Sequence, residues 1–315
     1  MERARQAGAQ PLAQAWKPAG RAELIGLGAY FLLVVSLADI LNVRLGVELM
    51  TLVVAVAALA ITRRVHRFIR DWWLYLLGLL MWNLSGPIAA ASPFPLHMDF
   101  MLNLDNAIFL GHQPVVMVQQ ALAPASGVNG WDVLNALIYN LHVPEPYIAG
   151  YFLWRLNRAV YFQFAASLLI LLVLGFLTFI VFPAVPPWMA AQRFNALPEV
   201  VNRFGLVVRA HPLPFHGTPI FYLFRLRGDA VAAFPSEHAA VPLLDLLAFW
   251  RVLGRRAWPL VLWVAAVLFS ILYLGEHWVT DALAGWLYVL VIFTAVRQHV
   301  TRHRQRSGDR ERQAR

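Results

Sequence analysis

The sequence predicts an all-α protein, a polytopic bundle of membrane-spanning helices. The composition is 60% hydrophobic and only 14% charged, whereas a soluble domain carries about 25% charged residues. Several apolar runs approach the length of about 20 residues that a helix needs to cross a bilayer core. The basic residues lie between these runs, a pattern that reports topology in membrane proteins. The bilayer is therefore the expected surroundings of most of the chain.

The composition also excludes several classes of protein and site. The chain has no Cys, so neither a disulfide framework nor a thiolate metal site is available. Its net charge of +9 would suit nucleic acid if the arginines shared one soluble face, but they are spread between apolar runs, and nucleic acid is not an expected partner. The first residues lack an apolar run followed by a cleavage site, which predicts a cytoplasmic tail rather than a signal peptide.

Seven apolar runs are clear candidates for spans, and an eighth, Leu134–Trp154, is interrupted by polar residues and prolines. The seven are Glu23–Leu41, Val47–Thr62, Trp72–Ala90, Ala159–Phe182, Ala239–Leu253, Trp258–Leu274 and Ala282–Val296. With eight spans, most of the 26 basic residues share one side of the membrane. With seven, the later arginine pairs and the C-terminal tail would lie outside, against the positive-inside bias. We therefore expect about eight transmembrane helices, with residues 91–133 and 183–236 on the extracytoplasmic side.

The first stretch that could carry chemistry is Phe234–Ala240, where Pro235 and Ser236 immediately precede an apolar run. Taken structurally, Ser236 is the N-cap of a helix and nothing more. Taken functionally, the backbone N–H groups of a helix start favour an anion such as phosphate. His238 then lies in the first turn, facing the same place.

The second stretch runs from Tyr273 to Gly285 and contains His277 and Asp281, four residues apart. On a helix this spacing puts both side chains on one face, so that the carboxylate accepts the imidazole Nδ1–H and leaves Nε2 as a nucleophile. The structural alternative is a simple hydrogen bond. Both His stretches lie at the extracytoplasmic ends of neighbouring late spans, which favours a shared catalytic site with His277, His238 and Asp281 as its members.

Other polar residues receive weaker assignments. Phe182–Trp188 ends a span on the same side and is expected to wall the same pocket without chemistry of its own. Arg225 and Arg227 lie shortly before Ser236 and are candidate phosphate ligands, although each could be a solvated loop charge; Arg209 is a weaker third candidate. Asp105 is expected in a turn of unknown role. We expect no bound metal, because His112, His142, His211 and His216 lack metal-ligand spacing, and no cofactor.

At these residues the sequence resembles the type 2 phosphatidic acid phosphatase superfamily. Its members carry a Pro-Ser-x-His element before one helix and a His-x-x-x-Asp element at a later helix, matched here by Pro235–His238 and by His277 through Asp281. The fuller forms of both elements, with the upstream Phe182–Trp188, look most like the inositol phosphorylceramide synthase (inositolphosphotransferase) branch and its bacterial relatives.

The resemblance implies a division of the chain and has two departures. It implies a six-helix catalytic membrane domain over residues 72–297, preceded by a tail (1–21) and two additional helices (22–71) and followed by a basic tail (298–315). Phosphatases of the superfamily usually carry Ser-Arg before the second His, where this chain has Ser270-Ile271. The Lys and Arg of their first motif are also missing. Both departures fit the synthase-like branch and leave the positive phosphate ligands unidentified.

The expected chemistry is phosphoryl transfer on a lipid phosphate or phosphodiester. His277 attacks phosphorus, Asp281 holds its tautomer, and a phosphohistidine forms. His238 protonates the leaving group and then activates the acceptor, while Ser236 and the helix start hold the phosphoryl oxygens. A water acceptor would make the protein a phosphatase and an alcohol acceptor a phosphotransferase; the branch resemblance favours transfer, in a bacterial plasma membrane with an extracytoplasmic site. A lipid carrier or flippase and a membrane scaffold are the non-catalytic alternatives.

Overall fold

All regular secondary structure in the described part of the chain is helical, as predicted. The structure is a computed structural model that describes residues 70–75, 78, 91–124, 126–141, 144–210 and 231–313. Residues 1–69, which hold the expected N-terminal tail and the first two expected spans, lie outside the described residues, as does most of Trp72–Ala90. The helices are α6 (Asp99–Ile108), α7 (Pro114–Leu122), α8 (Gly130–Asn140), α9 (Glu145–Leu156), α10 (Arg158–Val181), α11 (Pro187–Phe194), α12 (Arg203–Ala210), α14 (Glu237–Leu253), the 3-10 turn η1 (Gly254–Ala257), α15 (Pro259–Tyr273) and α16 (Val279–Gln313).

Three of the predicted spans agree closely with α10, α14 and α15, whose ends lie within two residues of the predicted ones. Two helical segments of the described chain are long and apolar enough to cross a membrane by length and composition, Arg158–Val181 and Val279–Arg302, and Pro259–Tyr273 is a shorter apolar helix. The total of about eight spans is therefore not confirmed. Helix α16 continues to Gln313, far beyond the predicted end at Val296, because its tail is rich in Arg and Gln, which favour helix.

The prediction of one span over Leu134–Trp154 is wrong, because this stretch forms parts of two helices. α8 ends at Asn140 and α9 begins at Glu145, with Pro144 as its N-cap and Pro146 in its first turn. Proline lacks a backbone N–H and disfavours helical backbone in the residue before it, so the chain cannot continue one helix through this point. The two helices have different neighbours: α8 packs against α12 and α15, whereas α9 packs against α10 and α14.

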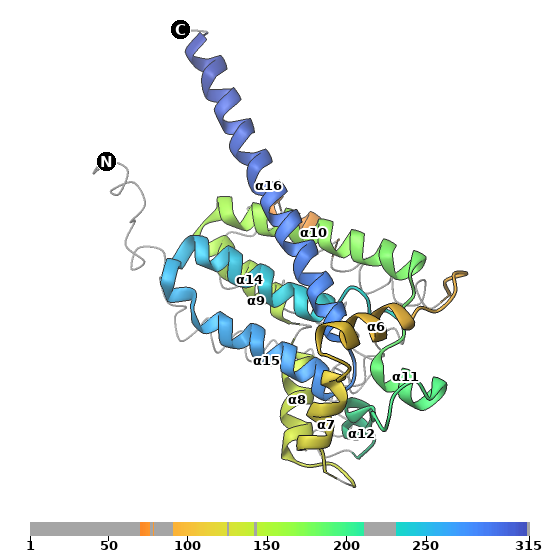
Figure 1. Cartoon of the computed structure of the whole chain (residues 1–315). Coiled ribbons are helices and arrows are strands. Elements are labelled where there is room, and N and C mark those ends of the chain that lie inside the picture. The colour runs from red at the N-terminus through yellow and green to blue at the C-terminus, as the bar shows by residue number, and fades with distance from the viewer. Residues whose placement is uncertain are drawn as a thin grey trace, which may run out of the picture.

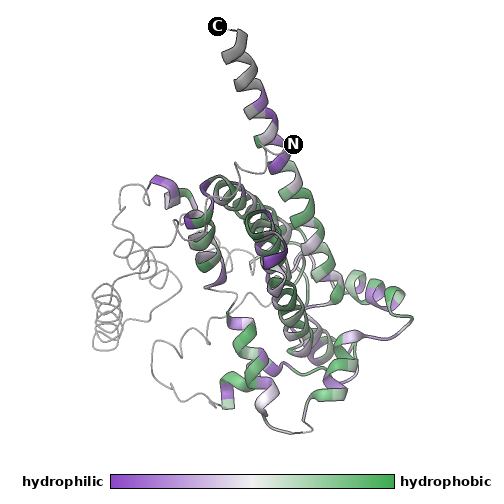
Figure 2. Cartoon of the chain, turned by 90° about the vertical axis from the view of Figure 1, so that its left-hand side faces the viewer, coloured by the Kyte–Doolittle hydropathy of each residue, from purple (hydrophilic) through white to green (hydrophobic). Residues whose placement is uncertain are grey.

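The core of the bundle lies between α9, α10, α14 and α16 (Figure 1). Buried apolar side chains from these helices form one cluster, which includes Leu153, Phe164, Leu168, Leu244 and Val289. The outward faces of α10 and α16 are also apolar and exposed. In Figure 2, α16 followed from the C-terminus is largely green where it passes the bundle. Contiguous exposed apolar surface of this kind is typical of contact with a membrane or a partner.

The short helices α6, α7, α8, α11 and α12 gather at the end of the bundle where α16 begins (Figure 1). The chain enters this layer through His97, whose backbone N–H donates to the Pro183 carbonyl oxygen (2.8 Å). The His97 ring stacks on Phe182, which directly follows α10, with centroids 3.8 Å apart. This layer surrounds both histidine stretches that the sequence singled out.

Candidate active site

The His238 stretch is built as the sequence predicts. Ser236 is the N-cap of α14, and its side chain accepts a hydrogen bond from the Ala239 N–H (3.2 Å). His238 therefore lies in the first turn of the helix. Ser236 is fully buried, and its backbone N–H donates to the Asp281 carbonyl oxygen (2.9 Å). The start of α14 is thereby joined directly to the first turn of α16.

His277 does not lie on a helix, so the predicted reason for its proximity to Asp281 is wrong. α15 ends in a left-handed Gly275 (φ +78°), and the N–H groups of Gly275 and Glu276 donate back to the carbonyl oxygens of Leu272 and Ile271 (both 3.0 Å). These two bonds form a Schellman motif, which favours Gly at this position. His277 follows in the loop before α16, and its Nδ1 still lies 3.4 Å from Asp281 Oδ2.

The two imidazoles lie side by side. His277 Nε2 is 3.2 Å from His238 Nδ1, and the ring centroids are 5.2 Å apart. On its other side, His277 Nδ1 is 2.9 Å from the Ala233 carbonyl oxygen. A carbonyl oxygen only accepts, so Nδ1 carries the proton and Nε2 of the neutral ring has a free lone pair. Ala233 is thus a closer acceptor for this proton than Asp281, which the sequence proposed for it.

Asp281 is completely buried and belongs to the first turn of α16. Its Oδ2 accepts a hydrogen bond from the Trp278 backbone N–H (2.8 Å) and faces His277 Nδ1. The carboxylate therefore closes the turn that carries His277 and lies beside its ring. The arrangement can orient the imidazole and stabilise a positive charge that develops on it.

Tyr139, from α8, stacks on the His238 ring. The two rings are nearly parallel (14°) with centroids 4.3 Å apart, and Tyr139 in turn contacts Phe204 of α12 (5.1 Å). His238 is therefore in contact with both Tyr139 and His277. Tyr139 was not predicted from the sequence, because one aromatic side chain among many in an apolar stretch carries no distinguishing signal.

Asp105 is also part of this region, although the sequence placed it in a turn of unknown role. It lies within α6 and is buried. Its carboxylate accepts hydrogen bonds from the backbone N–H groups of Val279 (3.0 Å) and Thr280 (2.8 Å) and from Thr280 Oγ1 (2.5 Å). Burial raises the pKa of Asp105 above its ordinary value. Helix α6 thus supplies the carboxylate that binds the start of α16.

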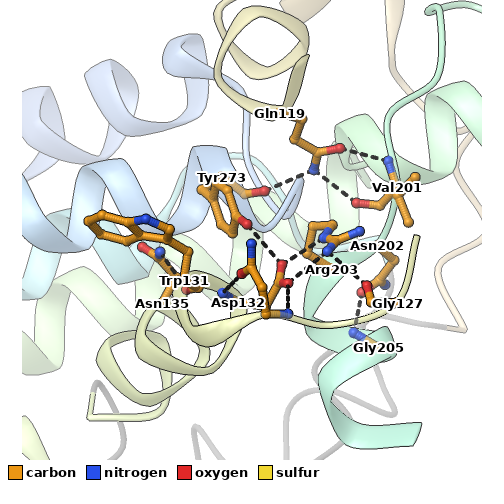
Figure 3. A network of polar contacts seen from close by, with 11 residues as sticks. Gln119, Gly127, Trp131, Asp132, Asn135, Val201, Asn202, Arg203, Gly205 and Tyr273 are labelled. Atoms are coloured by element: carbon orange, nitrogen blue, oxygen red, sulfur yellow. Dashed lines mark hydrogen bonds and ion pairs between the residues drawn. The ribbon is translucent and has the colours of Figure 1, made fainter. Parts of the chain in front are cut away.

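A buried polar network holds the end of α15 (Figure 3). Arg203 Nε and Nη2 each donate to Asp132, over 2.7 Å in both cases, and the Tyr273 hydroxyl donates to the same carboxylate (2.9 Å). Gln119 Nε2 donates to the Tyr273 carbonyl oxygen (2.8 Å). Burial opposes ionisation of Asp132, but the hydrogen bonds from Arg203 hold its pKa below the ordinary value. Arg203 therefore has a structural role. The network fixes Tyr273, which lies two residues before the Gly275 turn.

Helices α14 and α16 approach each other closely at Gly285. A Cβ added at this position would lie 2.4 Å from the Ser236 carbonyl oxygen, a separation that real Cβ atoms do not tolerate. Glycine is therefore required where the two histidine-bearing segments meet. The residue belongs to the second sequence motif, and the structure explains its identity.

The remaining predicted residues have mixed outcomes. Phe182–Trp188 lies beside both histidine stretches as expected: Trp278 Nε1 donates to the Val185 carbonyl oxygen (2.8 Å), and Ala233 N–H donates to that of Ala184 (3.3 Å). Arg225 and Arg227 lie outside the described residues. Arg209 is exposed near the end of α12. Within the described ranges, no group of three or more His, Asp or Glu could hold a metal ion.

Comparison with known proteins assigns the family. The family model described as the PAP2 superfamily matches residues 99–295, more than half of the chain. The chain belongs to the PAP2 superfamily. The matched region begins with α6 and ends within α16. It therefore contains Asp105 and the motif residues Ser236, His238, His277 and Asp281. The resemblance found from the two histidine motifs is thereby confirmed.

One relative bears on the branch of this PAP2 protein. A phosphoinositol dihydroceramide synthase of Bacteroides thetaiotaomicron is 26% identical over 211 residues, which cover 62% of this chain and 67% of the relative. Its name agrees with the inositol phosphorylceramide synthase-like branch. No solved structure matches the chain. At the level of the superfamily, the protein is a lipid phosphatase or transferase.

Proposed function

We propose that this PAP2 protein transfers a phosphoryl group from a lipid phosphate or phosphodiester to a hydroxyl acceptor through a phosphohistidine on His277. The observation that carries the proposal is the pair of imidazoles. His277 Nδ1 is held by Ala233 and Asp281, and its Nε2 faces His238 Nδ1 at 3.2 Å. In covalent catalysis the nucleophile usually lies within hydrogen-bond reach of an acid or base, and a further group orients the pair. Here His277 would be the nucleophile, His238 the acid and base, and Ala233 with Asp281 the orienting groups.

In the first step, the Nε2 lone pair of His277 forms a bond to phosphorus while the bond from phosphorus to the leaving oxygen breaks. Asp281 and the Ala233 carbonyl oxygen stabilise the charge that develops on the ring. Protonated His238 gives its proton to the leaving oxygen. A separation of 3.2 Å between the two ring nitrogens leaves no room for a phosphoryl group, so the side chains must part when substrate binds.

The phosphoryl oxygens are proposed to lie at the start of α14. The first turn of a helix presents backbone N–H groups and a partial positive charge to an anion, and Ser236 lies in this place. The corresponding start of α16 already binds a carboxylate, because the N–H groups of Val279 and Thr280 donate to Asp105. Arg225 and Arg227 remain our candidates for the positive side chains that complete the phosphate site.

In the second step, neutral His238 removes a proton from the acceptor, whose oxygen attacks phosphorus and releases His277. The name of the Bacteroides relative supports an alcohol as acceptor, and water would make the same site a phosphatase. The apolar helices support a location in the membrane, and the basic residues between the predicted spans support an extracytoplasmic site.

The test is a product assay with purified protein in detergent. Labelled lipid phosphates and phosphodiesters are incubated with and without alcohol acceptors, and we expect a product that depends on the alcohol: a new phosphomonoester from a lipid phosphate donor and a new phosphodiester from a phosphodiester donor. Free phosphate as the dominant product would instead make the enzyme a phosphatase. We expect His277→Ala to reduce turnover to background and His238→Ala to reduce it about 10²–10⁴-fold. The exposed His299 provides a matched control, His299→Ala.

The proposed mechanism predicts that the phosphohistidine on His277 can be detected. Acid-labile, base-stable label should accumulate on the wild-type protein and be absent from His277→Ala. Turnover retained by folded His277→Ala protein would eliminate His277 as the nucleophile.

A further inference from the structure

We propose that Asp105 is a positioning residue for catalysis, holding the first turn of α16 so that Asp281 and His277 are correctly placed. This inference rests on the proposed function, because it assigns a role to a residue that acts through the His277–Asp281 pair. Asp105 belongs to a different helix from either motif, and its spacing in the sequence predicts no role for it.

The contacts of Asp105 are concentrated on the residues next to the pair. Its carboxylate accepts hydrogen bonds from Val279 N–H (3.0 Å), Thr280 N–H (2.8 Å) and Thr280 Oγ1 (2.5 Å). The preceding N–H, that of Trp278, donates to Asp281 Oδ2 (2.8 Å). Two carboxylates thus bind three consecutive N–H groups, and His277 immediately precedes them in the chain.

The same turn connects α16 to α14. The Asp281 carbonyl oxygen accepts the Ser236 N–H (2.9 Å), while its carboxylate lies 3.4 Å from His277 Nδ1. A shift of this turn would therefore move the carboxylate away from the ring and also disturb the start of α14, which carries His238. Because catalysis depends on such placement, displacement by about 1 Å can cost on the order of 10²-fold in rate.

The charge of Asp105 has a second consequence at this position. Anionic groups are favoured near the N-terminus of a helix, where the backbone dipoles leave a partial positive charge. Asp105 occupies that place on α16, a helix of 35 residues. The start of α16 is therefore already occupied by a carboxylate of the protein, and a substrate phosphate is directed to the start of α14.

Helix α6 also offers a control for the specific carboxylate. Asp99 lies in the first turn of α6 and is exposed, whereas Asp105 is 2% exposed. A substitution at Asp99 changes the same type of side chain on the same helix without touching α16.

The experiment compares Asp105→Ala, Asp105→Asn and Asp99→Asn in the purified full-length protein, using the product assay with the lipid that the wild type turns over. For Asp105→Ala we expect kcat per folded molecule to fall about 10–100-fold, with KM changed by less than about 3-fold, because Asp105 does not contact substrate. Asp105→Asn keeps an oxygen that can accept from α16 and should recover part of kcat. Asp99→Asn should retain wild-type values.

A double-mutant cycle with Thr280→Val separates positioning from a general loss of stability. Thr280→Val removes the Oγ1 donor to Asp105, and its effect on kcat should disappear when Asp105 is already Ala. Unchanged kcat in folded Asp105→Ala would overturn the proposal. Equal losses from Thr280→Val in both backgrounds would also overturn it.

A structural readout distinguishes this inference from the proposed function. In protein labelled with ¹⁵N-histidine, the His277 ring signals, assigned by their loss in His277→Ala, report the Nδ1–H tautomer. We expect them to shift in Asp105→Ala and to stay unchanged in Asp99→Asn. Unshifted signals would refute the positioning role, whereas retained turnover in His277→Ala would refute the proposed function alone.

Discussion

The two histidine-bearing segments are held in different ways. The His238 segment is the start of a helix, and its local conformation follows from its own residues, because Ser236 caps the helix in which His238 stands. The His277 segment is a loop between α15 and α16, and it is held by side chains far away in the sequence. Asp105 binds the start of α16, and Gln119 binds the Tyr273 carbonyl oxygen at the end of α15.

The difference shows how a site can combine a self-contained element with a dependent one. A capped helix start needs one local hydrogen bond, typically contributing about 1 kcal/mol. The His277 loop also has local hydrogen bonds, in the Gly275 turn and from the Trp278 N–H to Asp281. Its ends are nevertheless bound by Gln119 and Asp105, which are far away in the sequence. Substitutions remote from the chemistry should therefore affect His277 more than His238, and the following predictions test this order.

The largest effect is expected from breaking the buried ion pair that supports the His277 side. Arg203→Ala leaves Asp132 as a buried charge without its main partner, which typically costs about 3–5 kcal/mol. We expect this loss in the free energy of unfolding of the detergent-solubilised protein, measured by chemical denaturation. Arg193→Ala removes an exposed arginine of α11 and should change the free energy of unfolding by less than about 0.5 kcal/mol.

A second comparison sharpens the result for this pair. Replacing both partners, Arg203→Met with Asp132→Asn, leaves no lone charge and should recover part of the loss. A single Arg203→Ala variant as stable as the wild type would show that the network does not support the His277 segment.

An intermediate effect is expected where the two segments meet. Gly285→Ala places a methyl group 2.4 Å from the Ser236 carbonyl oxygen, so α14 and α16 must separate at a cost of about 1–3 kcal/mol. Turnover should fall further than stability alone explains, because a shift of α14 against α16 misplaces the two imidazoles relative to each other. Gly130→Ala is the control, since nothing lies within 4 Å of a Cβ added there; equal turnover in the two variants would contradict the prediction.

The smallest effect on stability is expected from the local cap of the His238 segment. Ser236→Ala removes the acceptor for the Ala239 N–H and should lower the free energy of unfolding by about 1 kcal/mol. Ser236→Thr keeps a hydroxyl and should recover most of this difference if the buried site accepts its methyl group. A loss from Ser236→Ala as large as that from Arg203→Ala would reverse the proposed order of the two segments.

Much of the fold was predictable because its signals are local. Apolar runs of sufficient length predicted α10, α14 and α15 almost to the residue, and Ser236 before such a run predicted a helix start. The single span over Leu134–Trp154 was wrong because the positive-inside bias outweighed Pro144 and Pro146 in the prediction, whereas proline decides where a helix can begin.

The sequence by itself determined the helical class, the superfamily and the two motifs, because each depends on residues close together in the chain. Only the tertiary structure decided that His277 stands in a loop, that Ala233 accepts its Nδ1–H, and that Asp105 binds α16. These last contacts join residues 44 and 175 positions apart. No local spacing records such pairs, because a buried polar group is satisfied by whichever partner the folded chain brings to it.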